Sequence, residues 1–217
     1  MMMVGKQLFR VTGNSDSEEG KPLILVICSL IMYCAHKYFQ QSSELVFMDA
    51  TSSLDRFSCP MYILSTGSAS GVVLLGVFVV FNETASTITD GLNLLKSIMP
   101  SDAFFGKGGN TGPTLFLTDE LSSQREALRK VWPNARQLLC LFHYLQCWWK
   151  WLWEAKQGVN IDDRKIVMEL VCKLVYAQTL EDLRRILSHE LKDPSSKILK
   201  YPNVLKRVKA MQDNEEQ

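Results

Sequence analysis

The sequence predicts an α/β fold with one mixed sheet, in which three antiparallel strands are followed by two parallel strand–helix units. Short apolar runs bounded by glycine, proline and acidic residues predict the strands. Runs with apolar residues at positions i, i+3, i+4 and i+7 alternate with the later strands and predict helices packed on the sheet. After residue 156 the helical patterns continue without a strand pattern, which predicts a C-terminal helical appendage or insertion.

The bulk composition is that of a globular chain. With 217 residues, of which 47% are hydrophobic, the chain can bury a sizeable core, and an intrinsically disordered protein is excluded. The formal net charge of +1 gives no global electrostatic case for nucleic acid, so any such case has to be local. The 6 cysteines are scattered and form no CxxC pair, which indicates a reducing compartment, the cytosol or the nucleus.

The N-terminal region gives no membrane signal. Residues 1–20 contain loop-forming and acidic residues without the basic start of a secretory signal, and we expect a disordered leader. The longest apolar run, residues 23–35, is shorter than the roughly 18 residues that a membrane span requires, so we expect no membrane partner. Residues 22–40 are compatible with a buried strand followed by a short helix, although periodicity alone does not decide this.

Three strand-like runs come next. Residues 45–48 end on Asp49, residues 60–65 are short and apolar, and residues 72–81 are rich in valine and phenylalanine. Because glycines connect the last two runs, we expect an antiparallel hairpin.

Helix and strand patterns then alternate. An apolar stripe at helical spacing lies within residues 88–99 and stops at Pro100. The glycine-rich stretch 106–109 lacks the spacing of a phosphate-binding loop, so we interpret it as a turn. A short strand, residues 115–117, then leads to Thr118 and Asp119.

A second strand–helix unit completes the predicted core. Residues 121–132 carry another helical stripe, which a Trp-Pro-Asn turn interrupts. The apolar run 137–141 then leads into a tryptophan-rich helix that extends to Trp153. We therefore place the sheet-based core at residues 21–156 and the helical appendage at residues 157–217.

This order of elements is that of ribonuclease-H-like folds, in which the first and fourth strands lie side by side. Asp49 ends the first strand and Asp119 the fourth, so both carboxylates are expected at one edge of the sheet. Paired carboxylates suit hard divalent cations, and we expect Mg²⁺ or Mn²⁺. Two structural alternatives stay open: Asp49 can cap the turn after it, and Asp119 can be the N-cap of the next helix. Asp55 and Glu120 are nearby acids that we expect to be solvated.

Cys140 and His143 form a Cys-x-x-His pair at a strand-to-helix junction, and Cys147 follows one helical turn later. A thiolate and an imidazole can bind Zn²⁺, but two ligands do not make a site. We therefore expect no zinc, with Cys140 in the core and His143 hydrogen-bonded at the start of the helix. A zinc-stabilised structural domain that uses all three residues is the alternative.

Two further groups of residues could contact nucleic acid. The tryptophans at positions 148, 149, 151 and 153 are expected mostly in the core, with base stacking as the alternative. Basic residues are frequent between Lys197 and Lys209; we expect a solvated helix face, with phosphate contact as the alternative.

Four motifs, taken in order and spacing, resemble the Mutator-like (MULE) transposase domain. The resemblance covers residues 44–156. The motifs are Asp49-Ala50-Thr51, Thr118-Asp119, the turn Trp132-Pro133-Asn134-Ala135, and Cys140-Leu141-Phe142-His143.

The resemblance implies a DDE-type nucleotidyl transferase of the ribonuclease-H-like superfamily, acting in the nucleus on DNA at transposon ends. Such enzymes use two aspartates and one glutamate to hold two Mg²⁺ or Mn²⁺ ions for DNA strand cleavage and transfer. Asp49 and Asp119 match the first two acids, as catalytic residues and metal ligands. Cys140 and His143 match the family's Cys-x-x-His, whose role we take to be structural support. A homo-oligomer is compatible with this resemblance.

The third acid of the family has no aligned motif in this sequence. The family's flanking zinc modules are also not recognisable, so we expect the core of a longer transposase, as a fragment or a degenerate copy. The alternative is a catalytically inactive, domesticated transposase-derived domain that binds DNA or a protein partner. The acids that follow the Cys-x-x-His motif include Glu154, Glu169, Glu181 and Glu190.

Overall fold

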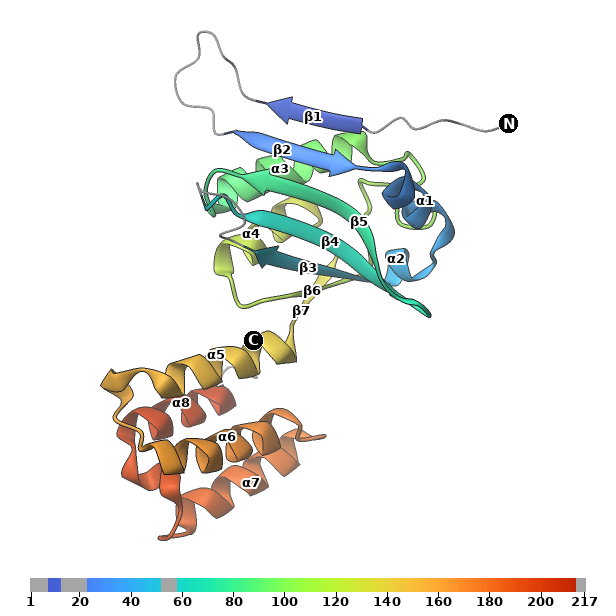
Figure 1. Cartoon of the computed structure of the whole chain (residues 1–217). Coiled ribbons are helices and arrows are strands. Elements are labelled where there is room, and N and C mark those ends of the chain that lie inside the picture. The colour runs from blue at the N-terminus through green and yellow to red at the C-terminus, as the bar shows by residue number, and fades with distance from the viewer. Residues whose placement is uncertain (1–7, 13–22, 52–57, 214–217) are drawn as a thin grey trace. The chain divides into compact units, whose positions relative to one another are not determined.

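The computed structural model describes residues 8–12, 23–51 and 58–213 of the chain. It has a mixed α/β fold that divides into two compact units, residues 1–140 (unit 1) and 141–217 (unit 2), each with its own hydrophobic core (Figure 1). In these described ranges, no helix is both long enough and apolar enough to cross a membrane.

One mixed sheet of seven strands forms the centre of unit 1. Its strands are β1 (Leu8–Thr12), β2 (Ile24–Cys28), β3 (Leu45–Thr51), β4 (Met61–Ser68), β5 (Gly71–Val80), β6 (Leu115–Thr118) and β7 (Arg136–Leu139). Their order in the sheet is β1-β2-β5-β4-β3-β6-β7. β4 pairs antiparallel with both β3 and β5, whereas β6 pairs parallel with both β3 and β7. The predicted hairpin is confirmed by the pairing of β4 with β5. The predicted pairing of the strand that contains Asp49 with the strand that precedes Asp119 is confirmed by that of β3 with β6.

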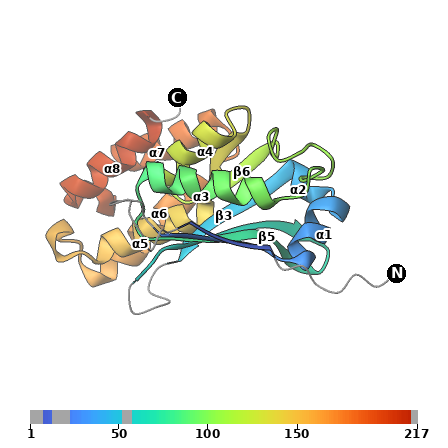
Figure 2. The ribbon, with the colours of Figure 1, turned by 90° about the horizontal axis from the view of Figure 1, so that it is seen from above.

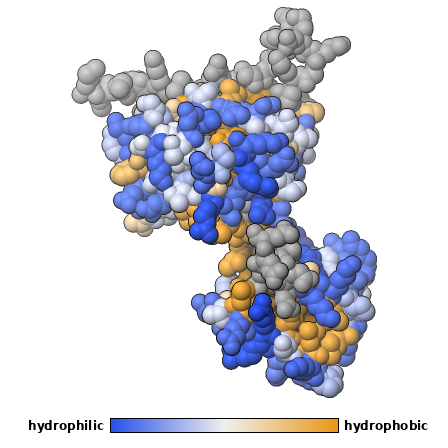
Figure 3. All heavy atoms as spheres, turned by 180° about the vertical axis from the view of Figure 1, so that it is seen from behind, coloured by the Kyte–Doolittle hydropathy of each residue, from blue (hydrophilic) through white to orange (hydrophobic). Residues whose placement is uncertain are grey.

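Helices cover one face of this sheet. Unit 1 contains the helices α1 (Leu30–Tyr38), α2 (Gln41–Glu44), α3 (Ala85–Ile98) and α4 (Ser122–Val131). Figure 2 shows α3 and α4 in one layer on the same side of the sheet. Along β3, Val46 and Met48 are buried while their neighbours are more accessible, because successive side chains of a strand point to opposite faces. Seen from behind, the outer surface of unit 1 is mainly hydrophilic (Figure 3).

The packing of α3 on the sheet follows from its apolar stripe. Ile88, Leu92 and Leu95 are fully buried, which confirms the stripe predicted for residues 88–99. Gly91 lies on the same side of the helix, where a Cβ atom would approach a ring carbon of Phe78 to 2.6 Å. A glycine at this position therefore allows the helix to approach β5 closely.

Trp132 anchors the connection between α3 and β6. The side chain is 1% exposed, and its indole N–H donates a hydrogen bond to the carbonyl oxygen of Gly109 at 2.7 Å. Its ring contacts those of Phe104 and Phe116, with ring centroids 5.9 and 5.2 Å away. The glycine-rich stretch 106–109 therefore has a structural partner in the tryptophan of the predicted Trp-Pro-Asn turn.

A buried histidine joins α1 to the sheet. His36 is 0% exposed; its Nε2 lies 3.1 Å from the carbonyl oxygen of Leu75, and its Nδ1 accepts from the backbone N–H of Phe104 at 3.4 Å. These partners assign the ring proton to Nε2 and therefore a neutral imidazole. Burial lowers the pKa of His36 to about 4, so the ring is uncharged at neutral pH.

Unit 2 is entirely helical in its described residues. Its core is built from apolar residues of every α-helix of the unit, including Trp148 and Leu152 of the first one. The elements are α5 (Leu141–Trp153), η1 (Ala155–Gln157), α6 (Ile161–Val175), α7 (Leu180–Lys192), η2 (Lys197–Lys200) and α8 (Pro202–Asp213), where η marks a 3₁₀ helix.

A charged pair ties α6 to the C-terminal part of unit 2. Asp163 accepts a hydrogen bond from the Tyr201 hydroxyl at 2.6 Å, and Lys197 lies 3.2 Å from the same carboxylate. Both partners lower the pKa of Asp163, and the hydrogen bond from Tyr201 has the larger effect. One of the basic residues between positions 197 and 209 is therefore engaged within the protein.

Two expectations about domain organisation differ from the structure. Within the leader, Leu8–Thr12 form β1, which pairs antiparallel with β2 and thereby satisfies the outer backbone edge of that strand. The other residues of the leader lie outside the described ranges. The boundary between the units falls after Cys140 rather than after residue 156, because the buried side chains of α5 belong to the core of unit 2.

Candidate functional site

Three of the predicted site residues lie in one row at an edge of the sheet. Toward the carboxyl ends of the strands, the parallel ladder between β3 and β6 ends with Met48 opposite Thr118. The parallel ladder between β6 and β7 ends with Thr118 opposite Leu139. The residue that comes next is Asp49 in β3, Asp119 after β6 and Cys140 after β7. Because all three strands run parallel, this row marks the carboxyl ends of β6 and β7 and lies near that of β3, which ends at Thr51. Ligands of open α/β sheets bind at such ends.

Asp49 lies within β3 instead of ending it. The strand continues to Thr51 because β4 pairs with it on its other side, with Asp49 opposite Ile63 and Thr51 opposite Met61. The predicted strand end at Met48 is therefore corrected to Thr51, because the ladder with β4 extends three residues further. The side chain is exposed, and its Oδ1 accepts from the backbone N–H of Ala50 at 2.9 Å.

Asp119 immediately follows β6 and is half-buried. Its Oδ1 accepts from the backbone N–H of Leu121 at 3.1 Å, so the carboxylate stabilises the turn between β6 and α4. The N-cap of α4 is Leu121, and this helix has no side-chain cap. The alternative of Asp119 as the helix N-cap is therefore wrong, because the helix begins two residues later than that role requires.

A buried glutamine connects α4 to β3 beside this row. Gln124 is 0% exposed, and its Nε2 donates a hydrogen bond of 2.9 Å to the carbonyl oxygen of Met48, the residue before Asp49. The bond ties the helix that follows Asp119 to the strand that carries Asp49. A lone glutamine in a largely polar helix gave no signal in the sequence, so this positioning contact was missed.

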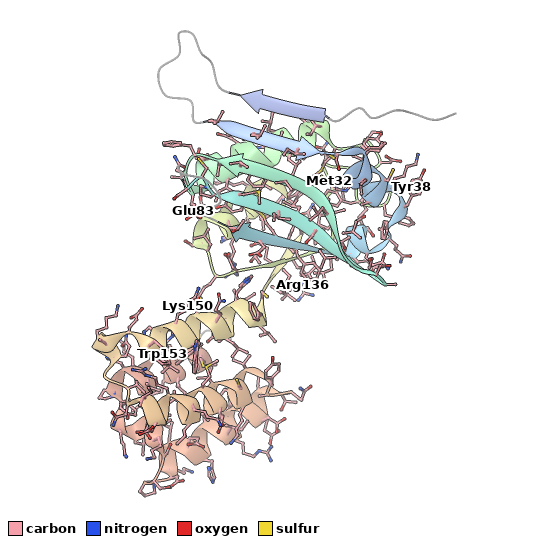
Figure 4. All side chains as sticks on the ribbon, in the orientation of Figure 1. Met32, Tyr38, Glu83, Arg136, Lys150 and Trp153 are labelled. Carbon is pink, nitrogen blue, oxygen red and sulfur yellow. The ribbon has the colours of Figure 1, made fainter. Side chains whose placement is uncertain are left out.

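A third carboxylate approaches the same edge from the connection between β5 and α3. Tyr62 is fully buried, and this burial is the largest cause of its raised pKa. The negative charges of Glu83 and Asp119 raise the pKa further. Both carboxylates therefore act on one tyrosine hydroxyl, for which no hydrogen-bond partner is found among the described residues. Figure 4 places Glu83 at the end of the sheet toward which β3 runs.

The sequence contained a usable signal for Glu83. β5 lies antiparallel to β4, as β3 does, so β3 and β5 run in the same direction and end at the same edge. Glu83 follows the end of β5 by three residues. Asp49 and Asp119 were selected because they follow apolar runs, and the same criterion would have selected Glu83.

The donor chemistry of this edge fits a hard divalent cation. Mg²⁺ is commonly bound by one or two carboxylates while it keeps several waters, which matches the oxygen ligands of Asp49 and Asp119. Across residues 23–51 and 58–213, no group of three or more His, Cys, Asp or Glu side chains is close enough to hold a metal ion. A divalent cation on Asp49 and Asp119 stays a prediction.

The Cys-x-x-His pair is divided between the two units. Cys140 is half-buried, and its backbone N–H donates to the carbonyl oxygen of Thr118 at 2.7 Å, which extends the β6–β7 ladder by one residue. His143 lies in the first turn of α5 and packs edge-on against Phe142, with ring centroids 5.5 Å apart. The supporting role of the pair stays a prediction. The alternative of a zinc site that adds Cys147 has no support, because these three residues are not grouped closely enough to hold one metal ion.

The two rival acids have different outcomes. Glu120 is exposed, as expected for a solvated residue. Asp55 lies outside the described residues.

In comparisons with known proteins, no family model matches the chain, and no curated protein matches it.

Proposed function

We propose that this chain is the catalytic core of a Mutator-like DNA transposase with a ribonuclease-H-like fold. The observation that carries the proposal is the parallel pairing of β3 with β6, which makes Asp49 and Asp119 neighbours at the carboxyl edge of the sheet. Two aspartates of distant sequence position, each within a motif that resembles the family, are thereby brought to one place.

The arrangement of the strands supports the same proposal. An antiparallel hairpin flanks β3 on one side, and two parallel strands with helix α4 between them flank it on the other. This is the order that the resemblance implies. The proposal includes DNA as the partner, the nucleus as the location and a homo-oligomer as a compatible assembly.

The residues at this edge have defined roles in the proposed chemistry. A divalent cation, Mg²⁺ or Mn²⁺, would supply the Lewis acid that activates water or a DNA 3′-hydroxyl for attack on a phosphodiester. Asp49 and Asp119 would hold this cation. Their own negative charges would otherwise repel the DNA backbone, so DNA binding at this edge requires the cation. Gln124 would keep the strand and the helix of the site in register.

Metal-dependent cleavage of plasmid DNA by the purified chain tests the proposal. We expect Mn²⁺ to support nicking, and D49N and D119N each to reduce the rate by about a hundredfold or more, because each removes a metal ligand. The matched control is E120Q, which removes the adjacent exposed carboxylate and should cleave like the wild type. Nicking that is unchanged in D49N and D119N would overturn the proposal.

The second candidate is a catalytically inactive, domesticated transposase-derived domain that binds DNA or a protein partner. The observation in its favour is that no acid after the Cys-x-x-His motif lies in a recognisable family motif. The same assay separates the candidates, because this one predicts no Mn²⁺-dependent nicking by the wild type. Retained DNA binding without cleavage would then support it.

A further inference from the structure

Unit 2 contains a cavity that the candidate site does not use. It is open to solvent and has a volume of about 490 Å³. Segments from three elements line it: the end of α5, the 3₁₀ helix η1 and one face of α8. The lining residues that matter here are Trp151, Lys156, Gln157, Asn203, Lys206 and Arg207.

The lining of this cavity is rich in positive charge. Lys156, Lys206 and Arg207 are cationic, and both lysine side chains are exposed. Glu154 lies nearby, where Lys156 at 3.0 Å and the side-chain amide of Gln157 at 3.0 Å bind its carboxylate. The hydrogen bonds from Lys156 and Gln157, and then the charges of Lys156 and Arg207, lower the pKa of Glu154. Glu154 therefore offsets part of the positive charge of the lining, and Lys206 and Arg207 are the cations that would contact an anionic ligand.

Arg207 is held in a fixed orientation by aromatic rings. Its guanidinium lies over the rings of Trp148 and Trp151, at 4.5 and 4.8 Å from their centroids. Trp148 is fully buried, and Trp151 packs edge-on against it with ring centroids 5.5 Å apart. A stacked guanidinium keeps its N–H groups at the edge of its plane, where they can bind phosphate oxygens.

The face of α8 that lines the cavity follows from helical spacing. Asn203, Lys206 and Arg207 occupy positions i, i+3 and i+4 and therefore lie on one side of the helix. Lys209 is exposed on the same helix but does not line the cavity. The basic residues of this region thus divide into two that face the cavity, one that pairs with Asp163, and others outside it.

We propose that this cavity binds a nucleotide unit of a single nucleic-acid strand. The phosphate would contact Lys206 and Arg207, and the base would contact the aromatic surface of Trp151. The amides of Asn203 and Gln157 add hydrogen-bonding groups at the same cavity. An acidic peptide would use the cations but would make no stacking contact with the part of Trp151 that lines the cavity. This inference stands independently of catalysis at the carboxylate edge of unit 1.

Binding of a fluorescein-labelled oligothymidylate of about six nucleotides to the full chain tests the inference by fluorescence anisotropy. We expect K206E to weaken binding about tenfold, because it removes a charge-assisted contact to phosphate. The matched control is K209E, which makes the same change of charge on the same helix and should weaken binding much less. Affinity should also fall as salt rises, less steeply in K206E than in the wild type.

Two further measurements assign the aromatic contact and the class of ligand. The oligonucleotide should quench tryptophan fluorescence, and W151F should lose most of this quenching while its circular dichroism stays that of the wild type. Unlabelled oligothymidylate and thymidine monophosphate should both displace the probe, because each supplies a phosphate and a base, whereas polyglutamate should displace it only at far higher concentration. Equal losses of affinity in K206E and K209E would overturn the inference, as would displacement by polyglutamate as effective as that by the oligonucleotide.

Discussion

The two units of this protein place their chemically interesting residues by different means. In unit 1 the row of Asp49, Asp119 and Cys140 depends on pairing between strands that are distant in sequence. In unit 2 the basic side of the cavity depends largely on spacing along one helix, with Lys206 and Arg207 on a single face of α8. The charges also differ: unit 1 gathers carboxylates at its edge, and unit 2 gathers cations around an aromatic surface.

This difference predicts how each unit responds to damage. Long-range strand pairing makes the geometry of the acidic edge depend on the whole core of unit 1. The cavity of unit 2 requires only that three neighbouring helical segments keep their packing. Because the cores are separate clusters of buried residues, a substitution in one core should act mainly on its own unit.

The largest expected effect is that of W132A. Removal of a 1% exposed tryptophan that also donates to Gly109 should lower the free energy of unfolding of unit 1 by about 3–5 kcal/mol. Hydrogen exchange measured by mass spectrometry should show faster exchange in β3, β6 and α3, with α6 and α8 unchanged. The counterpart L174A, a buried leucine of α6, should show the reverse pattern. Equal acceleration in both units by either variant would show that the cores are not energetically separate.

The next effect is a dependence of stability on pH that is confined to unit 1. The pKa of His36 is about 4 in the folded chain and 6.5 as a reference for the unfolded chain, because burial disfavours the charged ring. The unfolded state therefore binds more protons between these values. The stabilisation is complete above pH 6.5 and is lost as the pH falls toward 4, by about 3 kcal/mol in total.

Urea titrations followed by the NMR signals of unit 1 should measure this loss between pH 7 and pH 4.5. In H36Q the decline should be shallower, because the titrating ring is gone, even if the variant is less stable at pH 7. H189Q, which replaces an exposed histidine of unit 2, serves as the control and should keep the decline of the wild type. Equal slopes in the wild type and H36Q would contradict the assignment of this dependence to His36.

The smallest effects are those of two helix caps, one in each unit. The Thr84 hydroxyl accepts from the backbone N–H of Thr87 at 3.3 Å, and the Thr179 hydroxyl accepts from that of Asp182 at 3.0 Å. T84A and T179A should each cost about 1 kcal/mol. Local hydrogen exchange should quicken in α3 for the first and in α7 for the second. Faster exchange that spreads to the other unit would contradict the energetic separation of the two cores.

Local patterns predicted much of this architecture. The stripe in residues 88–99, the glycine-linked hairpin and the alternation of strands with helices all depend on neighbours in sequence, and the structure confirms them. The position of Asp119 after a strand was also predictable. The exact end of β3 was not, since its last residues are strand only because β4 pairs with them.

The misses have physical causes of the same kind. The apolar face of α5 fits a helix on a sheet as well as a helix in a bundle, so periodicity could not assign Trp148 to the core of unit 2. β1 contains only five residues, and its pairing with β2 is a contact that its own sequence does not encode. Glu83 follows an apolar run as the chosen aspartates do, and the antiparallel pairing of β4 and β5 brings it to their edge.

Sequence by itself determined most of the segments of this chain that become helix or strand, because hydrophobic periodicity and turn residues act over a few neighbouring positions. It also placed Asp119 directly after a strand. Only the tertiary structure decided that Asp49 and Asp119 lie in one row, that Glu83 approaches them, and that Arg207 stacks on two tryptophans. The physical reason is that these arrangements arise from strand register and core packing, which join residues far apart in the chain.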